Sequence, residues 1–250
     1  MLLKILFAAS FIAILASVNN LSQNTLGTSK KALDGAASST YSIAIIGDSM
    51  VDTMGEQLEY LQKALKKRYP QTTFYYYNYG MGSKNVEEGI NNFNSPFTYK
   101  TRNFVPLATL HPDIIIVGSF AYNPFYPHNR DRHWNSLTKL VQMAKDTGAD
   151  VYMLAEIAPL GYGFGKGPGG VNWEYDVSYK HSLDIVELLE NAMYISQDHL
   201  KVPLIDAYTP TKANGKFGTG HYTDPNDGIH PSVAGHQLMA ELIAAKIKLK

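Results

Sequence analysis

Five short apolar runs, spaced along the chain between segments of helical periodicity, constrain the fold more than any other feature. They lie at residues 42–47, 73–78, 113–118, 151–155 and 202–206. Between them, apolar residues recur at spacings of three and four, which predicts amphipathic helices. These predicted helices fall at about residues 54–69, 134–147, 182–197 and 231–248. Alternating strands and helices predict an α/β fold, a three-layer α/β/α sandwich around a five-stranded parallel sheet.

The N-terminus predicts export. Lys4 precedes an apolar run over residues 5–18, which suits a signal peptide and is shorter than the ~20 apolar residues of a membrane-spanning helix. Val18 stands where a cleavage site needs a small residue, so cleavage and retention as an N-terminal anchor are alternatives. We therefore expect an extracellular, periplasmic or outer-face membrane-anchored protein. Residues 19–40, rich in Ser, Asn, Thr and Gly, predict a flexible linker before a globular domain at 41–250.

Charge and cysteine content exclude several classes of function. Lys and Arg together number 22, as do Asp and Glu, so the net charge is zero. A neutral chain argues against nucleic acid as a partner. The absence of cysteine removes disulfides, thiolate nucleophiles and thiolate metal sites. We expect no cofactor and no metal, and a monomer.

A serine follows the first predicted strand directly. In a parallel sheet, ligands bind beyond the carboxyl ends of the strands, and the segment Gly47-Asp48-Ser49 lies at such an end. A serine at a strand-to-helix turn is accessible and lies near backbone N–H donors that can stabilise an oxyanion. The alternative is a helix cap, because Ser49 to Asp52 and Thr53 to Glu56 both have capping-box spacing.

A candidate base lies near the other end of the chain. Asp227 and His230 stand three residues apart, just before the last predicted helix. A nucleophilic serine needs a base, and the base needs an acceptor that orients it. Asp227 can accept from one imidazole nitrogen while the other faces Ser49. The alternative for His230 is a solvent-facing histidine before a helix.

Together these two segments resemble the SGNH (GDSL) hydrolase family. Its first block is Gly-Asp-Ser after the first strand, and its last block is Asp-x-x-His before the last helix, here Asp227 and His230. The resemblance covers about residues 42–246. It implies a flavodoxin-like order of strands and a serine esterase with Ser49, His230 and Asp227 as its catalytic triad. The family spacing makes Asp224 a poorer candidate for the acid than Asp227.

The resemblance also implies two oxyanion donors besides the N–H of Ser49. One is a backbone N–H at a glycine after the second strand, where we favour Gly82 over Gly80. The other is an asparagine side chain after the third strand. The family pattern there is Gly-x-Asn, whereas this chain has its asparagine three residues later, at Asn123. Either a longer loop brings Asn123 to the site, or Ser119 or a backbone amide replaces it.

The substrate expected from this reading is a small acyl ester, an O-acetyl group on a glycan being one case. The alternatives are a lysophospholipase, thioesterase or acyltransferase on the same triad, and a catalytically idle surface-tethered binding domain. Four further residues are expected beside the substrate, with Asp48 mainly bracing the turn: Asp48, Gly80, Tyr122 and His221.

Two other segments have formal motif spacing. Residues 161–170 contain Gly-x-Gly-x-x-Gly, but the segment neither leaves a strand directly nor opens a helix, so we expect a loop beside the active site rather than a dinucleotide site. Tyr162, Phe164 and Trp173 are its possible substrate contacts. Residues 128–133 offer His128, Asp131 and His133, which we interpret as a solvated loop.

Overall fold

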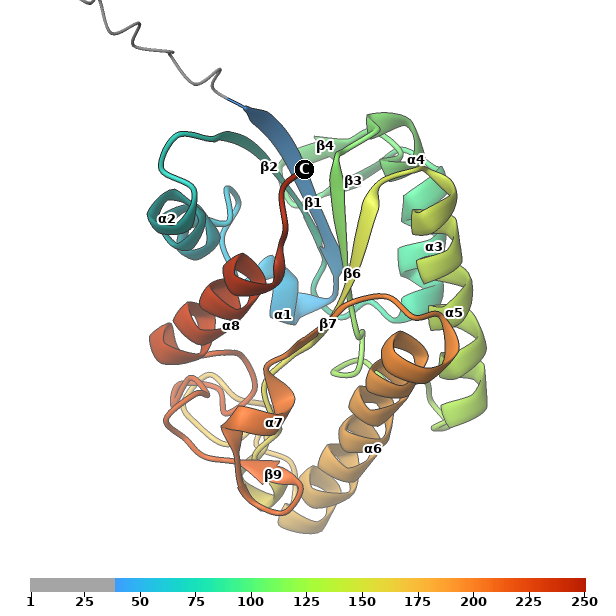
Figure 1. The fold of residues 1–250 in the computed structure, drawn as a ribbon. Helices are drawn as coiled ribbons and strands as arrows, with labels where there is room; N and C mark the ends of the chain where they lie inside the picture. The colour runs from blue at the N-terminus through green and yellow to red at the C-terminus, as the bar shows by residue number, and fades with distance from the viewer. Residues whose placement is uncertain (1–38) are drawn as a thin grey trace, which may run out of the picture. The chain divides into compact units, whose positions relative to one another are not determined.

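The computed structural model describes residues 39–250, and their centre is a parallel sheet of five strands. The strand order is β2-β1-β5-β6-β7, which confirms the predicted α/β sandwich and the flavodoxin-like order (Figure 1). The predicted segment at residues 1–18 lies outside the described residues, as does the predicted linker at 19–40 except for its last two residues; Thr40 already belongs to β1. The strands are β1 (Thr40–Gly47), β2 (Thr73–Gly80), β5 (Ile114–Gly118), β6 (Asp150–Ala155) and β7 (Leu204–Asp206).

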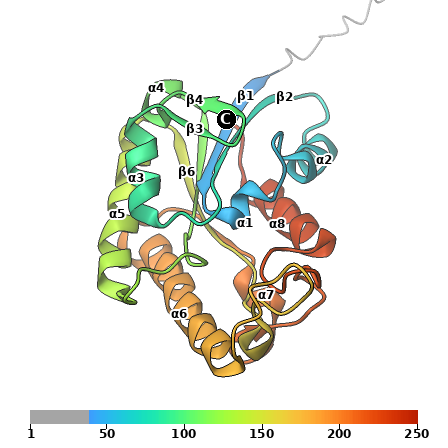
Figure 2. The ribbon, with the colours of Figure 1, turned by 180° about the vertical axis from the view of Figure 1, so that it is seen from behind.

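Helices cover both faces of this sheet (Figures 1 and 2). One face carries α2 (Glu59–Arg68) and α8 (Val233–Lys246), which pack on each other. The other face carries α3 (Val86–Asn94), α5 (Arg130–Asp146) and α6 (Tyr175–Tyr194). Because both faces are covered, the central strands are apolar without alternation: residues 43–46 of β1 and 115–117 of β5 are fully buried.

Two predicted helix boundaries were wrong. Helix α2 begins at Glu59 rather than near residue 54, because Gly55 has φ 96° and Leu58 has φ 55°, and both values break a right-handed helix. Met54 and Leu58 are nonetheless buried, so their helical spacing reflected core packing. Helix α6 begins at Tyr175, seven residues before the predicted start, and continues into a π-helical turn at Ile195–His199.

An antiparallel hairpin follows α3 and was not predicted. Its strands are β3 (Phe97–Tyr99) and β4 (Arg102–Phe104). It packs on the edge strand β2, with the ring of Phe104 5.1 Å from that of Tyr79. The hairpin reaches the carboxyl end of β2, where the candidate site lies.

The smaller elements complete the domain. They are α1 (Ser49–Asp52), α4 (Leu107–Leu110), a 3₁₀ turn (Gly161–Gly163), α7 (Tyr208–Thr211), β8 (Lys212–Asn214) and β9 (Phe217–Gly218). From residue 39 onwards, no helix has both the length and the apolar character to span a bilayer.

Candidate active site

Ser49 opens the first helix with its hydroxyl unpaired. Strand β1 ends at Gly47, where a Cβ would lie 2.3 Å from a methyl carbon of Val51, so only glycine allows the chain to turn here. The capping interpretation of Ser49 was wrong: the cap of α1 is Asp48, whose Oδ1 accepts from the N–H of Met50 at 2.9 Å. Within the described residues, neither the hydroxyl nor the N–H of Ser49 has a hydrogen-bond partner.

His230 and Ser49 line the same cleft, which has a volume of about 600 Å³. The His230 Nδ1 lies 2.7 Å from Asp227 Oδ2. Asp227 Oδ1 accepts from the backbone N–H groups of Ile229 (2.7 Å) and His230 (3.0 Å). Partial burial raises the pKa of Asp227, but these hydrogen bonds outweigh it and hold the pKa below its ordinary value. An ionised Asp227 that accepts from Nδ1–H leaves Nε2 of His230 free to take a proton.

The glycine-rich segment at residues 161–170 supports the loop that carries Asp227 and His230. The N–H of Gly165 donates to the carbonyl of Gly228 at 3.0 Å, and the N–H of Gly169 donates to that of Asn226 at 2.8 Å. A Cβ on Gly167 would lie 2.3 Å from the Asn226 carbonyl oxygen. These glycines therefore allow close packing of two backbones.

Asn123 reaches the cleft in spite of its late position. Phe120 adopts φ 55° and turns the chain after β5. The Asn123 Nδ2 donates one hydrogen to Asp48 Oδ2 at 3.2 Å. Its second amide hydrogen has no acceptor in the described part of the chain, so it remains available to a ligand in the cleft.

Gly82 also lines the cleft, but its N–H is already engaged. It donates to the hydroxyl oxygen of Tyr99 at 2.9 Å. The next residue, Ser83, lines the cleft too, adopts φ 59°, and has an N–H without an acceptor among residues 39–250. The sequence could not distinguish the two N–H groups, because the difference depends on a tyrosine from the distant hairpin.

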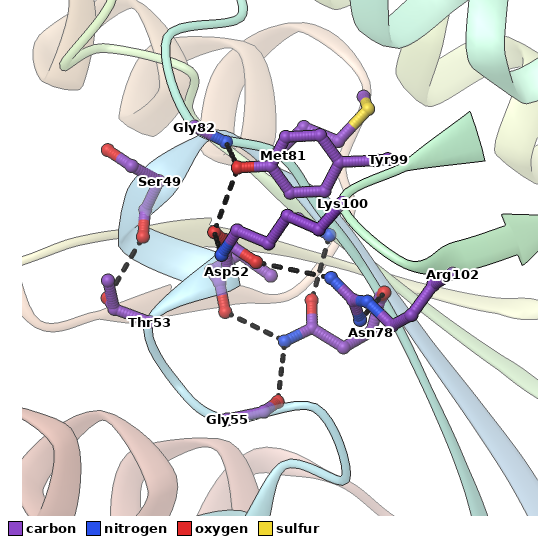
Figure 3. Close-up of polar contacts among 12 residues, drawn as sticks. Ser49, Asp52, Thr53, Gly55, Asn78, Met81, Gly82, Tyr99, Lys100 and Arg102 are labelled. Carbon is purple, nitrogen blue, oxygen red and sulfur yellow. Dashed lines mark hydrogen bonds and ion pairs between the residues drawn. The ribbon is translucent and has the colours of Figure 1, made fainter. Parts of the chain in front are cut away.

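A network centred on Asp52 joins the hairpin to helix α1 (Figure 3). Asp52 Oδ2 accepts from the Tyr99 hydroxyl at 3.1 Å and from Lys100 Nζ at 2.8 Å, and its Oδ1 accepts from Arg102 Nη2 at 3.2 Å. Below it, the Asn78 amide donates to the carbonyls of Val51 (3.0 Å) and Gly55 (2.7 Å). Sequence reasoning missed this network, because its members come from three separate segments.

Two buried carboxyl groups lie behind the site. Asp48 is fully buried, which raises its pKa in spite of the hydrogen bonds that it accepts. Glu156 directly follows β6 and is also fully buried. Its Oε1 accepts from the N–H of Ser119 at 3.0 Å, and its Oε2 contacts the Ser119 hydroxyl. Burial, together with the negative charge of Asp48, raises the pKa of Glu156 to about 8.

Of the other residues predicted to contact the substrate, one lines the cleft and two lie outside its lining. Tyr122 lines the cleft, but its hydroxyl donates inward to the carbonyl of Ile157 at 2.9 Å. Gly80 is buried against the backbone of α1, outside the cleft lining. His221 is exposed outside the lining, so the proposed contacts by Gly80 and His221 are not supported. Residues 128–133 are only partly solvated, since His133 is buried; the described residues contain no cluster suited to a metal ion.

An aromatic cluster lines the same cleft as Ser49 and His230. The rings of Phe164 and Trp173 lie 6.1 Å apart at an interplanar angle of 29°, and that of His181 lies 5.1 Å from Trp173. Burial lowers the pKa of His181, so this histidine is neutral at pH 7. Trp173 keeps 38% of its surface exposed, which leaves an apolar face for a ligand.

We expect Gly80→Ala to destabilise the domain by about 2 kcal/mol, because overpacked sites shift backbone. The added Cβ would lie 2.2 Å from the backbone nitrogen of Asp52 in α1. Thermal unfolding measures this loss. Gly220→Ala is the matched control, since a Cβ at Gly220 meets nothing within 4 Å. Equal melting temperatures for the two variants would contradict the expectation.

Solved structures share this fold at low sequence identity. A putative lipolytic protein of the G-D-S-L family from Desulfitobacterium hafniense has a TM-score of 0.59 and 13% identity, covering 83% of this chain and 99% of its own. A GDSL-like lipase from Bacteroides thetaiotaomicron has a TM-score of 0.57 and 14% identity, with coverages of 82% and 86%. Axe2, an acetylxylan esterase from Geobacillus stearothermophilus, has a TM-score of 0.56 and 16% identity, with coverages of 85% and 96%.

The sequence itself matches a family model over most of its length. No curated protein matches this chain. The model of the GDSL-like lipase/acylhydrolase family, however, matches residues 43–243, which include Ser49, Asn123, Asp227 and His230. The chain therefore belongs to the GDSL-like lipase/acylhydrolase family, whose members hydrolyse ester bonds.

Proposed function

We propose that this protein is an exported serine esterase that removes small acyl groups, O-acetyl groups in particular, from glycans. The observation that carries the proposal is the convergence of Ser49 and the Asp227–His230 pair on one cleft. Beside them lie two backbone N–H groups that have no acceptor among residues 39–250. A nucleophile, an oriented base and oxyanion donors are the parts that acyl transfer requires.

The mechanism proceeds through an acyl-serine. His230 Nε2 takes the proton of the Ser49 hydroxyl while Oγ attacks the ester carbonyl. The tetrahedral oxyanion accepts hydrogen bonds from the N–H of Ser49, the N–H of Ser83 and the Asn123 amide. His230 then gives the proton to the departing alcohol, and the acyl-serine is hydrolysed by water with His230 again as base. Asp227 holds the imidazole in the required tautomer throughout.

One oxyanion donor in this mechanism differs from the sequence prediction, which favoured the N–H of Gly82. The N–H of Gly82 donates to Tyr99 in this arrangement, so Ser83 replaces it as the donor from the loop after β2. The role of Gly82 as a direct donor would require the Tyr99 hydroxyl to leave.

Three features support a small acyl group on a glycan. The exposed face of Trp173 suits stacking against a sugar ring. Axe2, which shares the fold, is an acetyl-xylooligosaccharide esterase. Lys4 and the apolar run after it support export, and thereby access to envelope or extracellular glycans.

The test treats the full chain with a fluorophosphonate probe and locates the adduct by peptide mass spectrometry. We expect loss of fluoride and one phosphonyl group on Ser49, with none on Ser83 or Ser119. In parallel, 4-nitrophenyl acetate should be hydrolysed faster than the octanoate. An unlabelled Ser49 without ester hydrolysis overturns the enzymatic proposal, whereas preference for octanoate overturns the small acyl group and favours a lipid ester.

A further inference from the structure

The β3–β4 hairpin delivers an ammonium group to the cleft. Lys100, at the hairpin turn, reaches across the ring of Tyr99, with Nζ 5.2 Å from the ring centroid, towards Asp52 (Figure 3). Asp52 lies three residues after Ser49 in α1, and residues at this spacing share a helix face. Both Lys100 and Ser49 line the cleft. The ammonium therefore lies 2.8 Å from a carboxylate that is about one helical turn from Ser49.

Asp52 does not neutralise this cluster. Its side chain is 8% exposed and pairs with Arg102, which is 15% exposed, as well as with Lys100. One carboxylate against two cations leaves one positive charge in excess. The hydrogen bond with Asp52 raises the pKa of Lys100, so the ammonium stays charged at neutral pH.

The exposure of Lys100 indicates that its ammonium group is not needed to hold the hairpin in place. Its side chain is 60% exposed, and only one of its three N–H donors has an acceptor among the described residues. Arg102 and Tyr99 already tie the hairpin to Asp52. Among the described residues that line the cleft, Lys100 is the only lysine or arginine, and His181 is neutral.

We propose that Lys100 forms a binding site for an anionic group, a carboxylate or phosphate, carried by the ester substrate. The hairpin would thus select acidic esters over neutral esters of the same size. This inference rests on the proposed esterase function and adds the charge of its substrate. Asp52 and Tyr99 fix the ammonium before the substrate binds, which reduces the ordering cost of the ion pair.

The test compares matched ester pairs that differ in one charge. On the alcohol side the pair is 3-acetoxybenzoate and its methyl ester; on the acyl side it is 4-nitrophenyl hydrogen glutarate and 4-nitrophenyl valerate. The readout is the ratio of kcat/KM for the anionic ester to that for the neutral one, after subtraction of background hydrolysis. We expect Lys100→Met to lower this ratio about fivefold for at least one pair, as the loss of a partly exposed ion pair implies.

Controls separate the local charge from general effects. Lys100→Arg keeps the positive charge and should retain the wild-type ratio. Lys67→Met removes an exposed lysine on the remote helix α2, and this variant should also retain the wild-type ratio. Raising ionic strength from 20 to 200 mM should lower the wild-type ratio and barely affect that of Lys100→Met. If Lys100→Met leaves the ratio unchanged for both ester pairs, the proposed anion site is wrong, while the esterase function is unaffected. Failure to hydrolyse any ester, with Ser49 unlabelled, overturns the esterase function itself.

Discussion

Replacing Asp227 with asparagine should lower kcat for an acetyl ester by about 10⁴-fold, the order found when the acid of a serine triad becomes an amide. The Asp227 carboxylate accepts from His230 Nδ1 at 2.7 Å. An asparagine amide would instead donate to Nδ1 and move the imidazole proton to Nε2. Nε2 would then face Ser49 as a donor and could not accept its proton.

The neighbouring Asp224 offers a matched control for this substitution. It stands in the same loop, and its Oδ1 accepts from the backbone N–H of Asn226 at 2.9 Å, with no bond to the His230 ring among the described residues. Asp224→Asn should therefore change kcat by less than about threefold, since exposed turn contacts contribute little. Steady-state kinetics with 4-nitrophenyl acetate, with circular dichroism to verify folding, measures both variants. Comparable losses would refute Asp227 as the specific triad acid.

The sheet could be predicted from the sequence because a strand that is buried on both faces needs a continuous run of apolar residues. The runs at residues 42–47 and 113–118 are continuous apolar stretches, and only a covered parallel strand needs such a run. The candidate triad could be proposed from the sequence, since Asp227 and His230 are neighbours in sequence and Ser49 follows a strand directly; its catalytic role stays a prediction. Element ends were less predictable, because Leu58 in the left-handed region gives no compositional signal.

Features that depend on pairing between distant segments could not be read from the sequence. Which N–H of the loop after β2 is free depends on Tyr99, 17 residues beyond Gly82. The glycine-rich segment looked like a nucleotide motif because spacing alone cannot reveal that Asn226 packs on it. Glu156 had one usable signal in the sequence: it is a carboxylate directly after the apolar run at residues 151–155, at the carboxyl end of a predicted strand.

Glu156→Gln should stabilise the protein at pH 8 and have little effect at pH 4.5. Glu156 titrates near its ordinary value of 4.5 when unfolded, and burial raises its pKa to about 8 in the folded protein. Between pH 4.5 and about pH 8, Glu156 keeps its proton in the folded state and has lost it in the unfolded state. The stability of the fold therefore falls as the pH rises through this range. The fully buried Asp48, whose pKa is also raised, adds to this loss.

Glutamine can replace the protonated acid without titrating. Its carbonyl oxygen can accept from the N–H of Ser119, and its amide can donate to the Ser119 hydroxyl oxygen, which also accepts from the N–H of Ala121 at 3.1 Å. The free energy of unfolding of the variant, relative to that of wild type, should therefore rise by about 4 kcal/mol between pH 4.5 and pH 8.

Urea unfolding of wild type and Glu156→Gln from pH 4.5 to 8 measures the difference between their free energies of unfolding. The histidines that burial keeps neutral, His133 and His236, destabilise the fold as pH falls below about 6.5. Because they are present in both proteins, their effect cancels in the difference. A difference that stays flat from pH 4.5 to 8 would mean that Glu156 is ionised in the folded protein. The loop from Ser119 to Asn123 would then be held by a buried carboxylate rather than a neutral acid.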